Sequence, residues 1–219
     1  MNKNEFQDLI KTYKEIEEEK RRTFSNRLVQ IFATGGFDYV KYPTNLKNHE
    51  SIINYIDEMH EEKKEIRKYN FSEKEFELIK EIFQVVEYAQ DKLEIKKKIL
   101  PYTSLITSFG ILRIIKKLFK NKKGVRVFEI GPGSCYTGAL LFKEGYNYSC
   151  TDNAQGFYLW QSQILSELNE EFKENFEEKK LFKNEKLSHI PWWEFLELFK
   201  HQSKLKEKVD LIICDHALG

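Results

Sequence analysis

Residues 125–138 read VRVFEIGPGSCYTG and join an apolar run to a glycine-rich turn and the start of a second apolar segment. A β-branched run that ends in such a turn and opens a helix is typical of strand–turn–helix units that bind phosphates or nucleotide cofactors. Glycine at Gly131 and Gly133 lets the backbone turn tightly and approach a ligand without a Cβ in the way. The N-terminus of the following helix offers unpaired N–H groups to an anion. We therefore expect a ligand-binding loop here.

A carboxylate follows this loop at an informative distance. Asp152 lies 21 residues after Gly131, close to the separation of about 20 at which an acidic residue meets a ribose in nucleotide-binding units. A carboxylate suits a ribose diol because it accepts two hydrogen bonds at once. A plain helix N-cap is the alternative interpretation of Asp152. The fit to the dinucleotide fingerprint G-x-G-x-x-G is poor, because Tyr136 stands at the third glycine position and the next glycine is Gly138.

The segment Glu129-Ile130-Gly131-Pro132-Gly133 resembles motif I of the class I S-adenosylmethionine-dependent methyltransferases, in which an acidic and an apolar residue precede a G-x-G loop. The family usually has a third glycine where this chain has Cys135. The chain also resembles a subgroup of sugar O-methyltransferases over roughly residues 101–219, in the segments TDNAQGFYLWQ, HIPWWEF and DHAL. The resemblance implies a Rossmann-like sheet and S-adenosylmethionine as the cofactor. It also implies methyl transfer to a hydroxyl of a sugar, or of a phosphorylated or nucleotide-linked precursor of a surface polysaccharide.

The same resemblance implies which residues hold the cofactor, with Asp152 binding the ribose hydroxyls. The full set of expected cofactor-binding residues is Glu129, Gly131, Pro132, Gly133, Ser134, Asp152, Asn153, Gln155, His189 and Asp215. Asn153 and Gln155 lie where they could reach adenine or ribose, although turn formation explains Asn153 equally well. The family often contacts the adenine with a residue just after its third strand, frequently an acid. His189 ends the corresponding strand here and is the candidate for this contact, and a structural histidine is the alternative.

The end of the last strand is where the family places its acceptor chemistry, and here it carries Asp215 and His216. Methyl transfer is an in-line displacement for which the enzyme mainly supplies alignment and removal of the acceptor proton. Histidine can take that proton near neutral pH. We therefore expect His216 to be the general base and Asp215 to orient it or to contact substrate. The sequence shows no spacing of residues typical of metal ligands, so no metal site is expected.

Composition narrows the function classes. The 219-residue chain has a net charge of +1, which does not indicate a nucleic-acid surface, and the D/N-P-P-Y/F signature of DNA amino methylation is absent. Three distant cysteines, Cys135, Cys150 and Cys214, favour reduced thiols in a cytoplasmic protein. No signal peptide is evident, and the longest apolar run, residues 105–118, is too short and too charged to span a bilayer. The expected partner is a small-molecule acceptor, and a homo-oligomer remains open.

The periodicity divides the chain into two parts. Residues 1–100 predict a helical N-terminal cap or extension, with helices over 5–30, 51–69 and 73–98, the last begun by a capping box at Ser72 and Glu75. Its role as a cofactor cap or as a packing module is open. Residues 101–219 predict a Rossmann-like α/β domain that begins with a helix over 101–119. Strands are expected over 125–130, 146–151, 186–190 and 209–214, alternating with helices after Cys135 and over 155–176 and 191–199.

A class I methyltransferase sheet has seven strands, and the sequence predicts the first four. We therefore expect a C-terminally incomplete domain in which cofactor binding survives and turnover is in doubt. The alternative function is a cofactor-binding pseudoenzyme, or a module completed by a partner. A third alternative, an NAD-type oxidoreductase, predicts protection of the fold by NADH and not by S-adenosylhomocysteine.

Overall fold

The computed structural model of the chain describes residues 1–29, 46–59, 70–121, 124–177, 180–182, 186–200 and 208–214. Its centre is one four-stranded sheet in which every paired strand is parallel, with the order β3-β2-β1-β4. The strands are β1 (Arg126–Ile130), β2 (Asn147–Asp152), β3 (Leu187–Pro191) and β4 (Leu211–Ile213). The first residue of each strand lies within two residues of the predicted first residue. The α/β class is confirmed, and the strand order is consistent with a Rossmann-like sheet.

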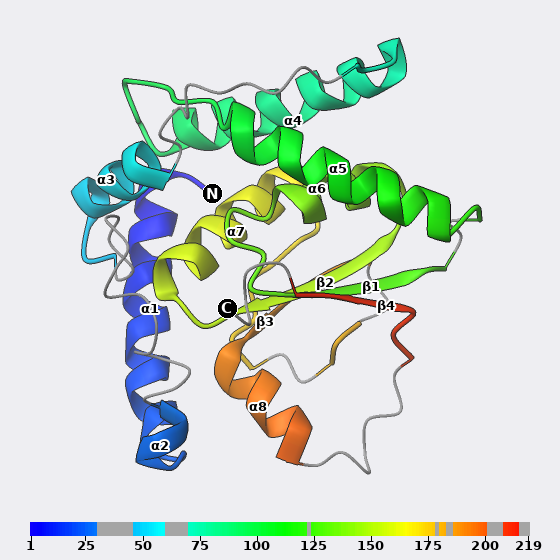
Figure 1. Cartoon of the computed structure of the whole chain (residues 1–219). Coiled ribbons are helices and arrows are strands. Elements are labelled where there is room, and N and C mark those ends of the chain that lie inside the picture. The colour runs from blue at the N-terminus through cyan, green and yellow to red at the C-terminus, as the bar shows by residue number, and fades with distance from the viewer. Residues whose placement is uncertain are drawn as a thin grey trace.

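Helices cover both faces of this sheet. The described helices are α1 (Lys3–Arg21), α2 (Asn26–Val29), α3 (His49–Met59), α4 (Glu73–Lys92), α5 (Tyr102–Leu118), α6 (Tyr136–Lys143), α7 (Gln155–Leu168) and α8 (Trp192–Lys200). Figure 1 shows α4, α5, α6 and α7 stacked on one face and α8 on the other, while α1 runs past the β3 side. The sheet is therefore the middle layer of a three-layer arrangement.

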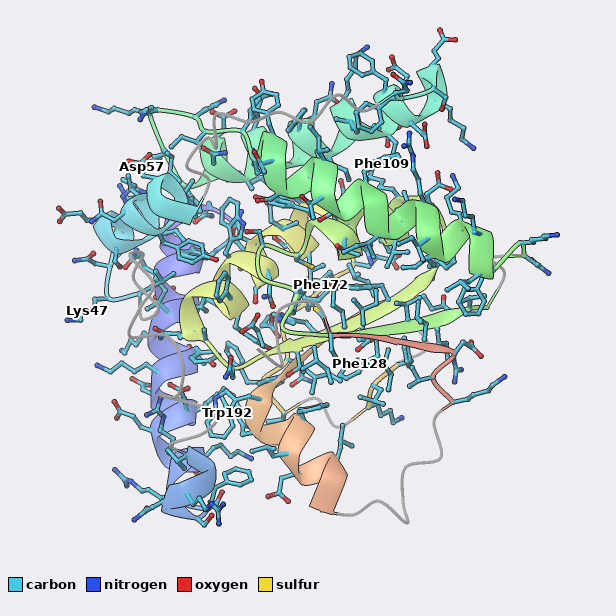
Figure 2. The ribbon with its side chains drawn as sticks, viewed as in Figure 1. Lys47, Asp57, Phe109, Phe128, Phe172 and Trp192 are labelled. Atoms are coloured by element: carbon cyan, nitrogen blue, oxygen red, sulfur yellow. The ribbon has the colours of Figure 1, made fainter. Side chains whose placement is uncertain are left out.

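Alternation along β1 supplies both faces of the sheet. Val127 joins the large apolar core under α5, α6 and α7, whereas Phe128 points to the α8 side and stacks on Phe195 with ring centroids 5.6 Å apart. Phe109 of α5 and Phe128 accordingly lie on opposite sides of the sheet (Figure 2). Successive side chains of a strand point to opposite faces, so a carboxylate at Glu129 belongs to the α6 and α7 side.

The N-terminal helix α1 is packed onto the sheet domain. Tyr13 is fully buried, with its ring centroid 5.2 Å from that of Tyr158 in α7 and 5.0 Å from that of Trp193 in α8. The indole N–H of Trp192 donates to Glu17 Oε1 at 2.9 Å. Since α1 contacts both α7 and α8, it braces the helices of the two opposite faces against each other.

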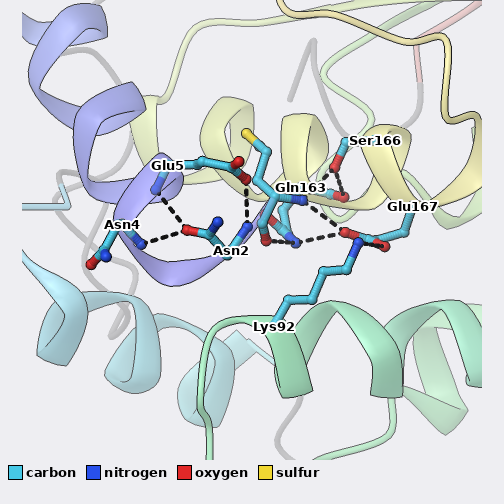
Figure 3. Close-up of polar contacts among 8 residues, drawn as sticks. Asn2, Asn4, Glu5, Lys92, Gln163, Ser166 and Glu167 are labelled. Atoms are coloured by element: carbon cyan, nitrogen blue, oxygen red, sulfur yellow. Dashed lines mark hydrogen bonds and ion pairs between the residues drawn. The ribbon is translucent and has the colours of Figure 1, made fainter.

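Charged groups fix the first turn of α1. The Met1 ammonium lies 2.8 Å from Glu167 Oε1, and Lys92 Nζ of α4 lies 2.8 Å from the other oxygen of the same carboxylate. Gln163 Nε2 donates to the Met1 carbonyl at 3.0 Å, as Figure 3 shows. Asn2 completes the arrangement as the N-cap of a capping box with Glu5. Three helices therefore meet at one buried carboxylate.

Helix starts agree with the sequence prediction better than helix ends do. The capping box of Ser72 and Glu75 is confirmed at the start of α4. The helix predicted over 5–30 ends at Arg21, where the Thr23 hydroxyl donates to the Lys20 carbonyl at 2.7 Å. The helix predicted over 155–176 ends at Leu168, because Asn169 leaves helical geometry with φ −142°. The helix predicted over 73–98 ends at Lys92, and residues 60–69 of the helix predicted over 51–69 lie outside the described residues.

The two predicted parts of the chain share one hydrophobic core. Phe6 and Ile82 of the first part belong to the same buried cluster as Leu105, Leu140 and Trp193 of the second. The predicted boundary between residues 100 and 101 stays a prediction. Within the described ranges, no helix is both long and apolar enough to cross a membrane.

Candidate functional site

The candidate site lies at the carboxyl edge of the sheet, where the strand order reverses. The chain steps from β1 to β2 to β3 in one direction, and β4 pairs on the other side of β1. In open parallel sheets, ligands bind outside the carboxyl ends of the strands at such a reversal. The glycine loop follows β1 directly and Asp152 ends the neighbouring β2. The topology therefore brings the two predicted ligand-binding features to one edge.

The glycine loop turns through left-handed backbone conformations. Gly131 has φ 68° and Gly133 has φ 57°, and the non-glycine residue Cys135 has φ 65°. The Gly131 N–H donates to the Thr151 carbonyl at 2.9 Å, which ties the loop to the end of β2. Cys135 stands where the resembled family has its third glycine, and its left-handed conformation explains why glycine suits this position.

Gly138 supplies a close approach of helix to strand. A Cβ built at Gly138 would lie 2.2 Å from the ring of Tyr148 on β2, closer than atoms can pack. The Tyr148 hydroxyl in turn donates to Glu129 Oε2 at 2.5 Å, and both residues are buried. Burial, followed by the nearby thiols and the Glu129 carboxylate, raises the pKa of Tyr148. Gly138 thus lets the tyrosine reach the acidic residue that precedes the loop.

Asp152 is a buried carboxyl with acceptor capacity left. It is 3% exposed; Oδ1 accepts the Ala154 N–H at 3.0 Å and Oδ2 accepts a Gln161 Nε2–H at 2.9 Å. A carboxylate offers about four acceptor sites, and a backbone hydrogen bond from Asn153 takes the third, so one site remains for a ligand. Burial raises the pKa of Asp152 to about 6 against the opposing effect of these hydrogen bonds. The N-cap of α7 is Ala154 and not Asp152, so the plain N-cap interpretation is wrong.

The N-termini of α6 and α7 meet the same edge without side-chain caps. Their N-cap residues are Cys135 and Ala154, and neither makes a side-chain capping hydrogen bond. The first N–H groups of a helix need acceptors, and the helix dipole favours an anion there. An anionic group of a ligand at this edge would meet that need.

The remaining predicted residues are divided between the surface and the interior. Gly131, Pro132, Gly133 and Asn153 are partly exposed, while Ser134 and Gln155 are buried. Gln155 Oε1 accepts the Leu46 N–H at 2.8 Å, so its carbonyl oxygen is engaged within the protein. Asp215 and His216 lie outside the described residues. The structure therefore brings the loop, Asp152 and Asn153 together, and their ligand contacts stay predictions.

His189 lies beneath this edge in a buried polar cluster. Its side chain is 0% exposed, its ring stacks on Tyr158 with centroids 3.8 Å apart, and both ring nitrogens have polar partners. This placement favours the structural interpretation of His189. Trp192 and Trp193, which follow β3, are buried packing residues.

Two residues of the site were missed by the sequence analysis. Gln161 reaches both Gly133 and Asp152, and Glu174 binds His189. Gln161 is 0% exposed and lies on α7 among apolar residues at helical spacing, a pattern typical of core. A run of polar residues, Gln161, Ser162 and Gln163, inside that apolar segment was the available signal, because buried polar side chains need partners.

The described residues hold no group of three metal-ligating side chains that could bind an ion. Cys135 and Cys150 are free and buried, and Cys214 is free and exposed. No protein-family model, curated protein or solved structure matches the chain. The functional argument therefore depends on the geometry of the carboxyl edge.

Proposed function

We propose that this chain binds S-adenosylmethionine at the carboxyl edge and acts as an O-methyltransferase on a hydroxyl of a sugar or small glycan precursor. One observation carries the proposal. The left-handed glycine loop after β1 lies beside Asp152 at the end of β2, at the point where the strand order reverses. Crevices of this kind bind adenosine-containing cofactors in parallel sheets.

The residues present fit the groups of the cofactor. Asp152 would accept a hydrogen bond from a ribose hydroxyl at the acceptor site that its protein partners leave. The partly exposed backbone of Gly131 and Gly133 allows a ligand to approach closely. The uncapped N-termini of α6 and α7 suit the carboxylate of the amino-acid part. Asn153 follows Asp152 directly, is partly exposed, and would contact ribose or adenine.

The proposed chemistry uses two residues after β4. When bound, the cofactor supplies a methyl group on a sulfonium. His216 would take the proton of the acceptor hydroxyl, and Asp215 would orient the imidazole or the acceptor. If the His216→Ala variant keeps near-normal turnover, His216 does not have this role.

Calorimetric titration and thermal shift with S-adenosylmethionine and S-adenosylhomocysteine test the binding. We expect a dissociation constant in the micromolar range, which corresponds to a binding free energy of roughly −8 kcal/mol. NADH is the comparison ligand, because an oxidoreductase would be protected by NADH and not by S-adenosylhomocysteine. No heat and no thermal shift with either adenosyl ligand would contradict the proposal.

A matched pair of variants locates the site. Asp152→Asn removes the carboxylate at the carboxyl edge, whereas Asp210→Asn makes the same change at the opposite edge, where Asp210 accepts the Arg126 N–H at 3.0 Å. We expect Asp152→Asn to weaken S-adenosylhomocysteine binding at least about tenfold, since a hydrogen bond to a charged group contributes ~1.5–3 kcal/mol. Asp210→Asn should bind like the wild type. Binding without methyl transfer to any sugar acceptor would favour the pseudoenzyme alternative.

A further inference from the structure

The glycine loop and Asp152 are joined by one buried side chain. Gln161 of α7 donates from Nε2 to the Gly133 carbonyl at 2.7 Å and to Asp152 Oδ2 at 2.9 Å. These two bonds use both protons of the amide nitrogen. Gln161 is 0% exposed, so water does not compete for them. The loop after β1 and the carboxyl after β2 therefore have a common anchor on α7.

Only one orientation of the Gln161 amide satisfies its neighbours. With Oε1 and Nε2 exchanged, an oxygen would lie where Nε2 now meets Gly133 O and Asp152 Oδ2, which are both acceptors when Asp152 is ionised. In the observed orientation Oε1 lies 3.0 Å from His189 Nε2. His189 must therefore donate from Nε2.

The other ring nitrogen of His189 also faces an acceptor. Nδ1 lies 2.9 Å from Glu174 Oε2, whose side chain is 6% exposed. Ser162 lies 3.3 Å from Nδ1, but its shorter contact, at 2.5 Å, is with the same Glu174 oxygen. Although burial alone would raise it, the pKa of Glu174 is lowered by the charge of His189 and by hydrogen bonds from His189, Ser162 and Tyr158. Glu174 Oε2 beside Nδ1 and the amide oxygen beside Nε2 are both acceptors, so the geometry points to a donor at each ring nitrogen.

We propose that Gln161 is a positioning residue for the carboxyl edge and that the buried pair of His189 and Glu174 holds its amide in this orientation. Glu174 holds His189 by Nδ1, His189 holds Gln161 by Nε2, and Gln161 fixes Gly133 relative to Asp152. The ring of Tyr158, stacked at 3.8 Å, fixes the plane of the imidazole. The effect on cofactor affinity rests on the proposed function, whereas the connection itself does not.

Two substitutions of His189 separate its two hydrogen bonds. The amide nitrogen of glutamine reaches about as far as Nε2 of histidine, so His189→Gln keeps a donor to Gln161. The amide nitrogen of asparagine reaches about as far as Nδ1, so His189→Asn keeps a donor to Glu174 and loses Gln161. Both variants lose the charge of the imidazolium, which makes them controls for each other. Gln161→Leu removes the anchor itself.

The first measurement needs no ligand. Backbone amide hydrogen exchange over residues 131–136 should rise at least about tenfold in His189→Asn and Gln161→Leu, the effect of losing roughly one buried hydrogen bond. His189→Gln should stay within about threefold of the wild type. Nitrogen-15 spectra of the wild type should show both ring nitrogens of His189 protonated. Equal exchange in the two His189 variants, or an unprotonated Nε2, would overturn the proposal.

The second measurement is the affinity for S-adenosylhomocysteine. We expect a loss of about tenfold in His189→Asn and less than threefold in His189→Gln. Equal losses in the two variants would overturn the link between Gln161 and affinity. If the wild type binds no S-adenosylhomocysteine, the proposed function fails, and the exchange measurement alone decides the positioning role.

Discussion

Cys135 holds a backbone conformation that glycine adopts at lower cost. Its φ of 65° lies in the left-handed region, and its side chain is 0% exposed at the N-cap of α6. An L-residue with a Cβ pays a steric cost there that glycine does not. The chain accepts this cost between the glycine loop and α6.

Comparison of Cys135→Gly with Cys135→Ala isolates this cost, since both remove the thiol. We expect the glycine variant to be more stable by about 1 kcal/mol, because alanine is strained where φ is positive. Urea denaturation measures the difference. The same comparison at Ala139, inside α6, should have the opposite sign, with Ala139→Gly less stable than the wild type by about 1 kcal/mol or more. A more stable Cys135→Ala variant would contradict the strain.

Asp152 should make stability depend on pH in an unusual direction for a carboxyl. Its pKa is raised by burial from 3.8 to about 6 in the folded chain. A raised pKa means that the protonated form is favoured by folding, so this contribution is present below the unfolded pKa and is lost as pH rises through about 6. The ionised carboxylate therefore lowers the stability of the folded chain.

Asp152→Asn removes this titration. The unfolding free energy of the wild type minus that of the variant should fall as pH rises from about 3.5 to 8, by roughly 3 kcal/mol. Urea denaturation at a series of pH values measures this difference, in which the titrations of other groups cancel. A difference that is constant with pH, or that grows as pH rises, would show that Asp152 is not destabilised when ionised.

At the scale of the element, the docking of α1 depends on Glu167. This carboxylate of α7 is 3% exposed and binds both the Met1 ammonium and Lys92. We expect Glu167→Gln to destabilise the fold by about 1.5–3 kcal/mol, because two cations lose a buried charged partner. Chemical denaturation measures the loss, which should change little with added salt since the carboxylate is shielded from solvent.

The exposed ion pair at the same end of α1 is the control. Lys3 Nζ lies 2.8 Å from Glu94 Oε2, with the two side chains 37% and 66% exposed. Exposed pairs contribute little, so Glu94→Gln should unfold like the wild type within measurement error. If the two glutamine variants behave alike, the buried position of Glu167 has no special effect.

The sequence could predict elements whose signals are local. Alternating β-branched residues ending in glycine located β1, and Ser72 with Glu75 located the start of α4. The end of α7 depended on a distant contact. The chain leaves the helix at Asn169 and brings Glu174 back to His189, which lies 15 residues further on. Such a contact has no periodicity in the sequence.

Surface and core positions of α4 also depend on packing that the local sequence does not predict. Phe76, Ile79 and Val86 lie at helical spacing along α4, which is typical of one apolar face. Ile79 and Val86 are buried, but Phe76 is 50% exposed and lies under the ammonium of Lys80. Phe76 lies in the first turn of α4, where Arg113 of α5 binds the neighbouring Glu75 and the phenylalanine ring stays at the surface. Spacing predicts a face, and only packing decides how much of it is covered.

At the scale of the whole molecule, the helical and sheet parts depend on each other for burial. Tyr13 of α1 lies among Tyr158, Phe176 and Trp193, and α4 packs on α6 and α7. Neither part would keep these side chains from water without the other. Elements that share one apolar core unfold together, because loss of one exposes the contacts of the next.

We therefore expect one cooperative unfolding transition for the whole chain. Fluorescence reports the three tryptophans, Trp160, Trp192 and Trp193, which all lie in the sheet part, whereas far-ultraviolet circular dichroism reports helices of both parts. The two probes should give coincident urea transitions. Tyr13→Ala, which removes a fully buried ring of α1, should shift both midpoints equally, by a destabilisation of about 3–5 kcal/mol. A helical signal that melts first while the tryptophans stay native would instead establish an independent N-terminal domain, with its boundary near residue 100.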